Sequence, residues 1–346
     1  MTQDPPEDTF DPEAAPDAEP GEVLDAEERE SLQRVERGGI PIEAERRLRE
    51  LGENGGTFTS DLSVADFALC HGLGLRPLAQ VMGSSIYQVA SATTAQWPSW
   101  AGGFMFELNY LSDAWNEVRD RALHRLALEA QAVGADAVVG VDLRTGAHDF
   151  VENAIEYVVL GTAVRQGAAA SAQVGPPASV QAPTAGSGHA AGRRAQDSAH
   201  RGPGGEPVLT ELSVADYANL RRAGVEPLGV VAWSAAYYVR ASFNTQMMGG
   251  LGAMTYTNQE LPEFTEGVYS AREAVMGRMT AQAAQLGATG VIGARINHSA
   301  QRYELNSAGR GSASGLMVTF HAIGTAIRET EAATLYAPEM TMDLTT

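Results

Sequence analysis

The sequence predicts an α+β protein made of two tandem copies of one β-α-β-β unit, each with an extra leading helix. The first observation is a repeat: residues 62–90 and 212–240 lie 150 positions apart and are identical at 13 of 29 positions without a gap. The second is its continuation, because GADAVVG and GTAV in the first half are answered by GATGVIG and GTAI in the second. The third is that both copies show the same order of helical and strand-like spacing. Self-similarity of this length indicates a duplicated domain.

Each copy is expected to begin with a short helix. Ser-x-x-Asp at Ser63, repeated at Ser213, is a capping box that starts a helix. Gly74 and Gly224 are suited to end it, since glycine accepts the left-handed conformation of a helix C-terminus. A proline then separates the helix from a strand in each copy. We expect these strands at Leu78–Ser91 and Leu228–Phe243.

A Gly-rich apolar loop leads from this strand to the longest helix of each copy. In copy one the helix ends at Gly134, and in copy two it spans Ala271 to Leu286 and ends at Gly287. One stripe at helical spacing is predicted to face the core in copy one: Trp115, Val118, Ala122, Leu126 and Ala130. Two strands close each unit, at Ala137–Leu143 and Ile155–Val164 in copy one and at Val291–Ile296 and Leu316–Ile327 in copy two. Copy two carries about ten extra residues between its last two strands.

Composition shifts divide the chain into five parts. Apolar residues are too sparse at the N-terminus for independent folding, and the segment between the copies has the composition of a linker. The expected parts are an acidic disordered tail with two short helices (1–55), domain one (56–165), an Ala/Gly/Ser/Pro-rich linker (166–207), domain two (208–329) and a C-terminal tail (330–346). The two short helices are expected near Val23–Val35 and Pro41–Gly52. The second is expected to pack on domain one or on a neighbouring subunit.

Charge and cysteine content narrow the classes of binding partner and the cellular location. The net charge of −19 argues against nucleic acid, since phosphate binding depends on Lys and Arg. Cys70 is the single cysteine, so an intrachain disulfide is impossible. The N-terminus is acidic and Pro-rich, unlike a secretory signal. No apolar run reaches the roughly 18 residues that a membrane-spanning helix needs. We therefore expect a cytoplasmic protein.

These motifs resemble the YbjQ family of small bacterial proteins. The run RDRALHRLALEAQAVGADAVVGV at Arg119–Val141 and VLGTAVR at Val159–Arg165 carry the resemblance in copy one, and GATGVIGAR and SGLMVTFHAIGTAI carry it in copy two. Gly-Gly pairs at 102–103 and 249–250 fall before the long helices, as in the family. The resemblance implies a dodecin-like unit, assembly into a ring that is typically a pentamer, and a heavy-metal-binding label. It implies no established enzymatic activity.

The residues themselves give little support to a metal ion as cofactor. A soft-metal site needs converging thiolates and imidazoles. The candidates are Cys70 with its neighbour His71, and His148 in a turn beside Asp149 and Glu152. The alternative for the first pair is a buried helical cysteine beside a surface histidine, because copy two has Leu220 and Arg221 there. No paired Cys or His motif at metal-binding spacing is present.

No enzyme class is indicated, and no catalytic or cofactor-binding residue is assigned. Neither copy shows a nucleophile with a base at motif spacing, a phosphate loop or a dinucleotide fingerprint. The acidic residues that crowd the start of each long helix fit the favourable electrostatics of a helix N-terminus, and the alternative is a shared carboxylate site for a cation. We therefore expect a non-enzymatic protein.

The apolar loops before the long helices are the least ordinary feature. They contain Trp97, Trp100, Phe104, Met247, Met248 and Met254. Such side chains are common at interfaces, and a loop that exposed them to solvent would promote aggregation. A three-stranded sheet with one helix also leaves strand edges unpaired. We expect a ring-forming homo-oligomeric binding protein whose loops meet the neighbouring subunit. The alternative is a scaffold whose loops contact another protein or a membrane surface.

Overall fold

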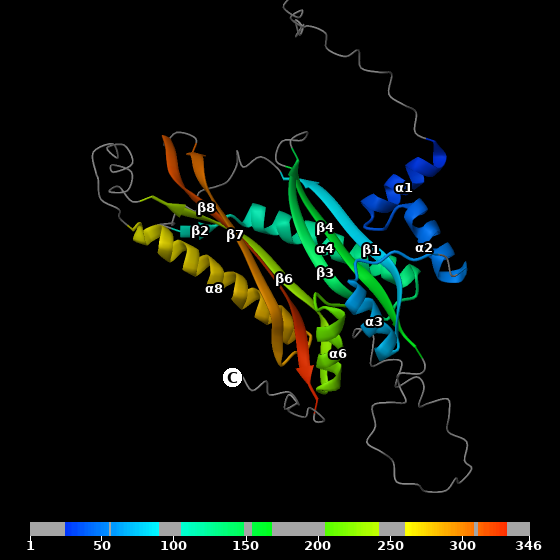
Figure 1. The fold of residues 1–346 in the computed structure, drawn as a ribbon. Helices are drawn as coiled ribbons and strands as arrows, with labels where there is room; N and C mark the ends of the chain where they lie inside the picture. Colours follow the sequence, from blue (N-terminus) through cyan, green and yellow to red (C-terminus); the bar gives the residue numbers. More distant parts are fainter. Residues whose placement is uncertain are drawn as a thin grey trace, which may run out of the picture.

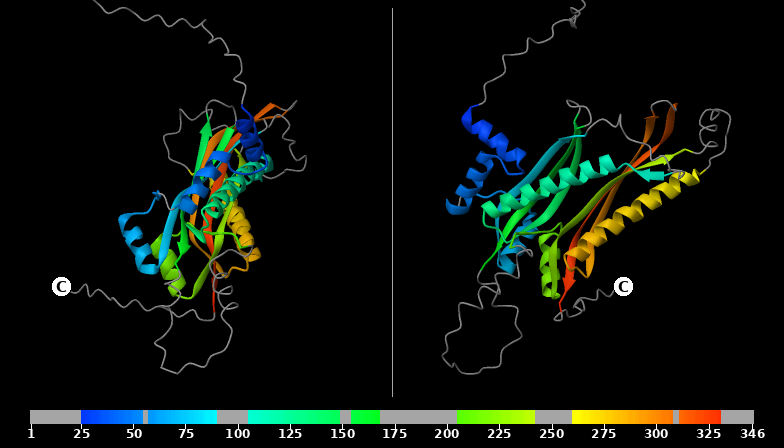
Figure 2. Two further views of the ribbon diagram at one scale, coloured as in Figure 1. Left: turned by 90° about the vertical axis from the view of Figure 1, so that its right-hand side faces the viewer. Right: turned by 180° about the vertical axis from the view of Figure 1, so that it is seen from behind.

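The computed structural model describes residues 25–54, 57–89, 105–148, 154–167, 205–241, 260–307 and 311–330. Figure 1 shows two twisted sheets that lie side by side, each with one long helix. In the right-hand view of Figure 2 the two long helices run in the same direction across the sheets, as expected for two copies of one unit. The predicted α+β class with two tandem units is confirmed. No helix among these residues combines the length and apolar character that crossing a membrane requires.

Copy one follows the predicted order of elements. Ser63 caps the leading helix by accepting a hydrogen bond from the Asp66 backbone N–H at 3.1 Å, and Gly74 ends it with a φ of 66°. The elements are α3 (Val64–Leu73), β1 (Leu75–Gln88), α4 (Asn109–Ala132), β3 (Ala137–His148) and β4 (Ala154–Gln166). Strand β4 lies between β1 and β3 and is antiparallel to both.

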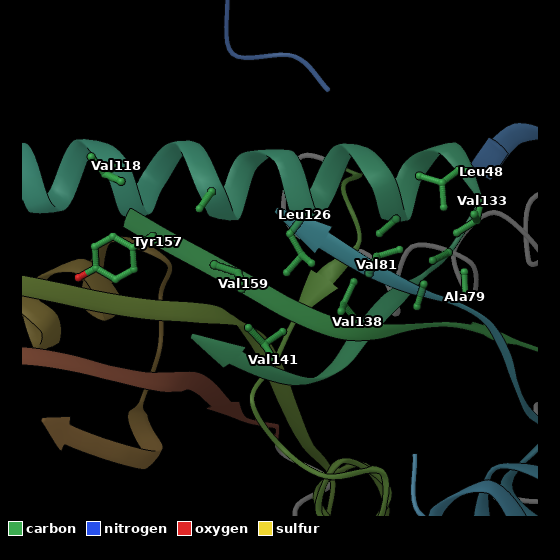
Figure 3. Close-up of a cluster of buried hydrophobic side chains, with 14 of the residues drawn as sticks. Leu48, Ala79, Val81, Val118, Leu126, Val133, Val138, Val141, Tyr157 and Val159 are labelled. Carbon is green, nitrogen blue, oxygen red and sulfur yellow. The ribbon is translucent and has the colours of Figure 1, made fainter. Parts of the chain in front are cut away.

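The core of copy one lies between α4 and the sheet (Figure 3). The predicted stripe of α4 faces it: Val118, Ala122, Leu126 and Ala130 are fully buried, and Trp115 packs against them partly exposed. Val81, Val138 and Tyr157 meet this stripe from three different strands, and each is fully buried. Burial of each large side chain contributes roughly 1.5–3 kcal/mol, so this stripe holds helix and sheet together.

Copy two repeats the plan with a longer final hairpin. Its elements are α6 (Val214–Arg222), β6 (Val225–Arg240), α8 (Pro262–Gln285), β7 (Gly290–Ser307) and β8 (Gly311–Glu329). The extra residues of copy two extend this hairpin, because β7 and β8 stay paired from Gly290–Ile327 to Ser307–Gly311. Val275 and Met279 on α8 pack on Val231 and Val318 of the sheet, in the manner of copy one.

Each sheet has four strands, where three were expected from one copy alone. Strand β2 (Met105–Glu107) belongs to copy one but pairs with β6 of copy two. Strand β5 (Val208–Leu209) leads into copy two but pairs with β3 of copy one. The sheet orders are therefore β1-β4-β3-β5 and β2-β6-β8-β7. Each copy thus supplies a strand to the other copy's sheet edge.

The two short N-terminal helices pack on copy one. They are α1 (Ala26–Glu36) and α2 (Ile42–Asn54), close to their predicted positions. Asp25 caps α1 in a reciprocal capping box with Glu28. Leu48 of α2 is fully buried and joins the core of copy one. Arg125 of α4 fixes the connection between them by donating to the Gly39 and Val35 carbonyl oxygens at 3.1 and 2.7 Å.

Candidate functional site at the domain junction

The most highly organised polar region joins α4 of copy one to β6 of copy two. Strand β2 pairs with β6 only as far as Glu107, and the chain then turns into α4. The backbone pairing is continued by Leu108, whose N–H donates to the Ala236 carbonyl at 2.8 Å. Ser112 follows one helical turn later, and its Oγ accepts from the Ala236 N–H at 3.0 Å. The start of α4 thus provides the hydrogen bonds at the edge of β6 that a neighbouring strand would otherwise provide.

Asn116 is the centre of this junction. Its Nδ2 donates to the Ser234 carbonyl at 2.8 Å and its Oδ1 accepts from the Ser234 N–H at 3.0 Å, so the side-chain amide pairs with the strand as a neighbouring peptide would. Nδ2 also donates to the Ser112 carbonyl at 2.7 Å. Because buried backbone groups need partners, this amide satisfies part of the edge that β2 does not reach.

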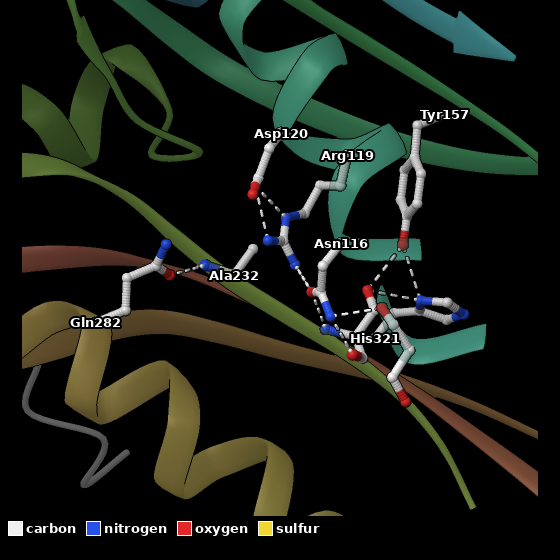
Figure 4. A network of polar contacts seen from close by, with 9 residues as sticks. Asn116, Arg119, Asp120, Tyr157, Ala232, Gln282 and His321 are labelled. Carbon is white, nitrogen blue, oxygen red and sulfur yellow. Dashed lines mark hydrogen bonds and ion pairs between the residues drawn. The ribbon is translucent and has the colours of Figure 1, made fainter. Parts of the chain in front are cut away.

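Arg119 places a buried charge beside the amide. Its side chain is 2% exposed, donates to Asn116 Oδ1 and forms an ion pair with Asp120 at 2.7 Å (Figure 4). Its guanidinium also lies over the Trp233 ring at 5.9 Å, and Arg278 of α8 lies over the same ring at 5.2 Å. Such cation–π contacts attach both long helices to one tryptophan of β6.

Three polar side chains meet next to this amide. His321 Nδ1 lies 2.8 Å from the Tyr157 hydroxyl and 3.0 Å from Ser234 Oγ, and these two oxygens are 2.9 Å apart. Tyr157 belongs to β4 of copy one, and the other two belong to copy two. Burial and the charge of Arg119 lower the pKa of His321 to about 4, and burial raises the pKa of Tyr157 to about 12. All three are therefore neutral near pH 7.

This group has the residue types of a catalytic site but the setting of a structural one. Ser234 and Tyr157 are 1% and 0% exposed, and none of the three side chains lines the pocket between α2, α3 and the start of β1. A base with a pKa of about 4 is also poorly matched to proton transfer near pH 7. The geometry supports a specific, fully hydrogen-bonded contact between the two copies.

We expect the junction to weaken in mild acid because of His321. Its pKa in the unfolded chain is ordinary, about 6.5, and in the folded chain it is about 4. Between these values the unfolded state binds more protons, so the free energy of unfolding falls as the pH falls from 6.5 to 4, by about 3 kcal/mol in total. Above about pH 7.5 His321 is neutral in both states and adds no pH dependence.

Urea unfolding of wild type and His321→Gln across pH 4–7.5 measures this contribution. The glutamine keeps hydrogen-bonding capacity but does not titrate, so the difference between the two stabilities should shrink steadily below pH 6.5. The comparison cancels Glu129 and Glu211, whose pKa values burial raises and which act in the opposite direction. Parallel curves for the two proteins would contradict the assignment.

The predicted metal candidates lie on two elements, α3 and β3. Cys70 on α3 is fully buried against Leu75, Val139 and Val164, and burial raises the pKa of its thiol to about 11. His71 lies on the same helix and contacts the Phe67 ring edge-on at 5.0 Å. His148 ends β3, where its backbone pairs with Ala154. Among the described residues, no three His, Cys, Asp or Glu side chains form a group that could hold a metal ion.

The six apolar loop residues lie outside the described residues. Their burial by a neighbouring subunit, partner or membrane stays a prediction for Trp97, Trp100, Phe104, Met247, Met248 and Met254. A pocket of about 510 Å³ lies instead between α2, α3 and the start of β1. Phe58, Phe67 and His71 line it beside Arg165, whose guanidinium is already engaged by the Val133 and Gly134 carbonyls. The sequence indicated neither this pocket nor the junction.

Both copies match one family model. The YbjQ model, described as "Putative heavy-metal-binding", matches residues 78–166 and 228–329. An encapsulin nanocompartment protein of Mycobacterium tuberculosis is 30% identical over 295 residues, which cover 83% of this chain and 92% of that relative. A match that covers 83% of the chain includes parts of both copies.

Shorter relatives match parts of the chain. A UPF0145 protein of Clostridium novyi is 41% identical over 59 residues, 17% of this chain and 55% of that relative. The match thus spans about half of the clostridial protein. A UPF0145 protein of Pseudothermotoga lettingae is 28% identical over 104 residues, 30% of this chain and 89% of that relative. No solved structure is significantly similar to the chain.

Proposed function

The chain belongs to the YbjQ family, and from that membership we propose that it is a non-enzymatic binding protein that assembles with itself into a closed homo-oligomer. The observation that carries the proposal is the exchange of strands at the junction, where β2 completes one sheet and β5 the other. Each unit has one edge that accepts a strand from a neighbouring unit and one strand to give. A single chain forms only one junction between its two units, so among the described strands one edge of each unit stays available for a further junction. Unpaired strand edges are normally covered in native proteins, and oligomerisation is one way to cover them.

The name of the mycobacterial relative supports the same proposal. That protein is described as an encapsulin nanocompartment protein, and the match to it covers 92% of its length. A compartment is built from repeated contacts between copies, so a chain related to such a protein over 83% of its own length is suited to a role in an assembly. We propose a cytoplasmic location for it, which the single cysteine, Cys70, supports.

Heavy-metal binding, which the family description suggests, finds no fitting site among the described residues. A soft-metal site needs accessible thiolates or imidazoles that converge. Cys70 is buried with a raised pKa, and no group of three ligands forms in the described part of the chain. We therefore propose that assembly does not depend on a metal ion.

Native mass spectrometry with light scattering tests both parts of the proposal. We expect the purified chain at micromolar concentration to have a mass that is a multiple of 36.5 kDa, and we expect that mass to survive treatment with EDTA. A 36.5 kDa species without added chelator would overturn the assembly proposal. Dissociation by EDTA, reversed by Zn²⁺ but not by Mg²⁺, would restore a role for the metal.

A further inference from the structure

The exposed apolar side chains of the described residues are concentrated on two faces of the chain. Eight large apolar side chains are exposed among the described residues, and seven of them, all except Leu32, belong to these two faces. We call the first the acceptor face, with Val64 (87% exposed), Phe67 (36%), Met82 (46%), Ile86 (51%) and Tyr87 (38%) on α3 and β1 of copy one. The second is the donor face, with Leu261 (38%) and Tyr269 (64%) at the start of α8 in copy two.

The duplication gives each of these residues a counterpart in the other copy. Counterparts are 150 positions apart in the leading helix and first strand, as for Gly74 and Gly224, and 153 apart in the long helix, as for Gly134 and Gly287. Every counterpart is buried. They are Val214 (1% exposed), Tyr217 (4%), Ala232 (3%), Ala236 (0%), Tyr237 (7%), Leu108 (3%) and Asn116 (8%).

These counterparts are buried at or beside the internal junction. Val214 and Tyr217 of α6 pack on Ala137, Val139 and Val164 of the copy one sheet. Ala236 is bonded through its backbone to Leu108 and Ser112. The exposed residues therefore form second versions of the two surfaces that meet at the internal junction. One lies on copy one and the other on copy two, and the described residues do not cover them.

The edges of the two sheets show the same difference between the copies. The outer edge of β6 receives β2, and the outer edge of β3 receives β5. Their counterparts, β1 and β7, each end a sheet among the described strands. Burial agrees with this difference: Val138 and Val139 of β3 are 0% and 1% exposed, whereas Val291 and Ile292 at the same positions of β7 are only partly buried.

We propose that the donor face of one chain docks on the acceptor face of a second copy of the same chain, repeating the internal junction between chains. The inference rests on the proposed self-assembly and specifies its surface. Leu261 N–H would donate to the Ile86 carbonyl of the next chain, and Thr265 Oγ1 would accept from the Ile86 N–H, as Leu108 and Ser112 do with Ala236. Ser60 would bond β7 near Val291 as Thr210 bonds β3 at Val138.

The N-terminal helices leave room for this contact. Leu48 of α2 joins the core of copy one, and Arg125, which binds the connection between the two helices, also donates to the Ser84 carbonyl of β1. Ile86 and Tyr87 lie beyond that point and stay exposed. Because donor and acceptor faces differ, the contact is heterologous, and it joins chains head to tail into a ring if the rotation closes.

Two charge substitutions on exposed positions test the proposal without disturbing the core. Ile86→Glu blocks the acceptor face and leaves the donor face intact, and Tyr269→Glu does the reverse. Each variant alone should be a 36.5 kDa monomer at concentrations where the wild type is assembled, a weakening of at least tenfold. Leu32→Glu, on α1 and outside both faces, is the matched control and should keep the wild-type mass.

Mixing the two variants distinguishes a head-to-tail contact from any other. Each partner retains one working face, so the mixture should form a species of two chains, twice 36.5 kDa, and grow no further. Retention of the wild-type mass by either variant, or a mixture that stays monomeric, would overturn the proposal. A wild type that is itself monomeric would overturn the proposed assembly instead, and circular dichroism of each variant checks that it remains folded.

Discussion

Replacing Asn116 by leucine is expected to lower the free energy of unfolding by about 3–5 kcal/mol, although the two side chains are similar in size. The amide is 8% exposed and makes hydrogen bonds to both backbone groups of Ser234. Leucine would leave that buried N–H and C=O without their side-chain partner and would remove a hydrogen bond from Arg119. Each orphaned buried polar group costs about 1–3 kcal/mol, and more when it is charged.

The loss should be local as well as global. Hydrogen exchange of peptides that cover residues 230–240 should accelerate, because Asn116 and Ser112 protect that part of β6. Glu117→Gln is the matched control on the next position of α4, where the side chain is 50% exposed and pairs with Arg121. An exposed pair of this kind contributes about 0–1 kcal/mol. Equal stabilities of Asn116→Leu and Glu117→Gln at one protein concentration would show that the amide does not hold the junction.

The sequence predicted the parts of the fold that repeat or that have a period. The Ser-x-x-Asp caps, the stops at Gly74 and Gly134 and the apolar stripe of α4 are local signals, and each lies where it was expected. The duplication strengthened these signals, because a pattern that occurs twice in the same order is unlikely to arise by chance. The leading strands begin three residues earlier than expected, because the chain enters the sheet before Pro77 and Pro227.

The exchanged strands could not be predicted in the same way. Strands β2 and β5 contain three and two residues, too few for any periodicity, and their partners lie in the other copy. What the sequence did carry was a polar stripe on α4. Ser112, Asn116 and Arg119 follow one another at helical spacing, and all three are buried. Read as a second buried face, that stripe would have indicated the junction.

The two copies also differ where the repeat aligns them. Position 83 is glycine in copy one, and its counterpart at 233 is tryptophan. In copy one, α4 approaches β1 so closely that a Cβ built on Gly83 would lie 1.9 Å from the Ala122 carbonyl oxygen and 2.7 Å from the Leu126 nitrogen. In copy two, Trp233 is partly buried and packs against the core beneath Arg119 and Arg278. The close approach of α4 to β1 in copy one therefore requires glycine at this position.

Gly83→Ala should therefore destabilise copy one by about 3 kcal/mol, because the added methyl group meets helix backbone that cannot rotate away. Relief requires α4 to move off the sheet, which would loosen Leu126 and Val81 in the core. Gly277→Ala adds the same methyl group on α8, where no described atom beyond the adjacent residues and the helix's own backbone lies within 4 Å, and in a helix it should stabilise by about 0.5–1 kcal/mol. Urea midpoints of the two variants should thus move in opposite directions from the wild type. If both moved upward, the close packing of α4 on β1 would be wrong, and with it the account of why the duplicated position holds glycine in one copy and tryptophan in the other.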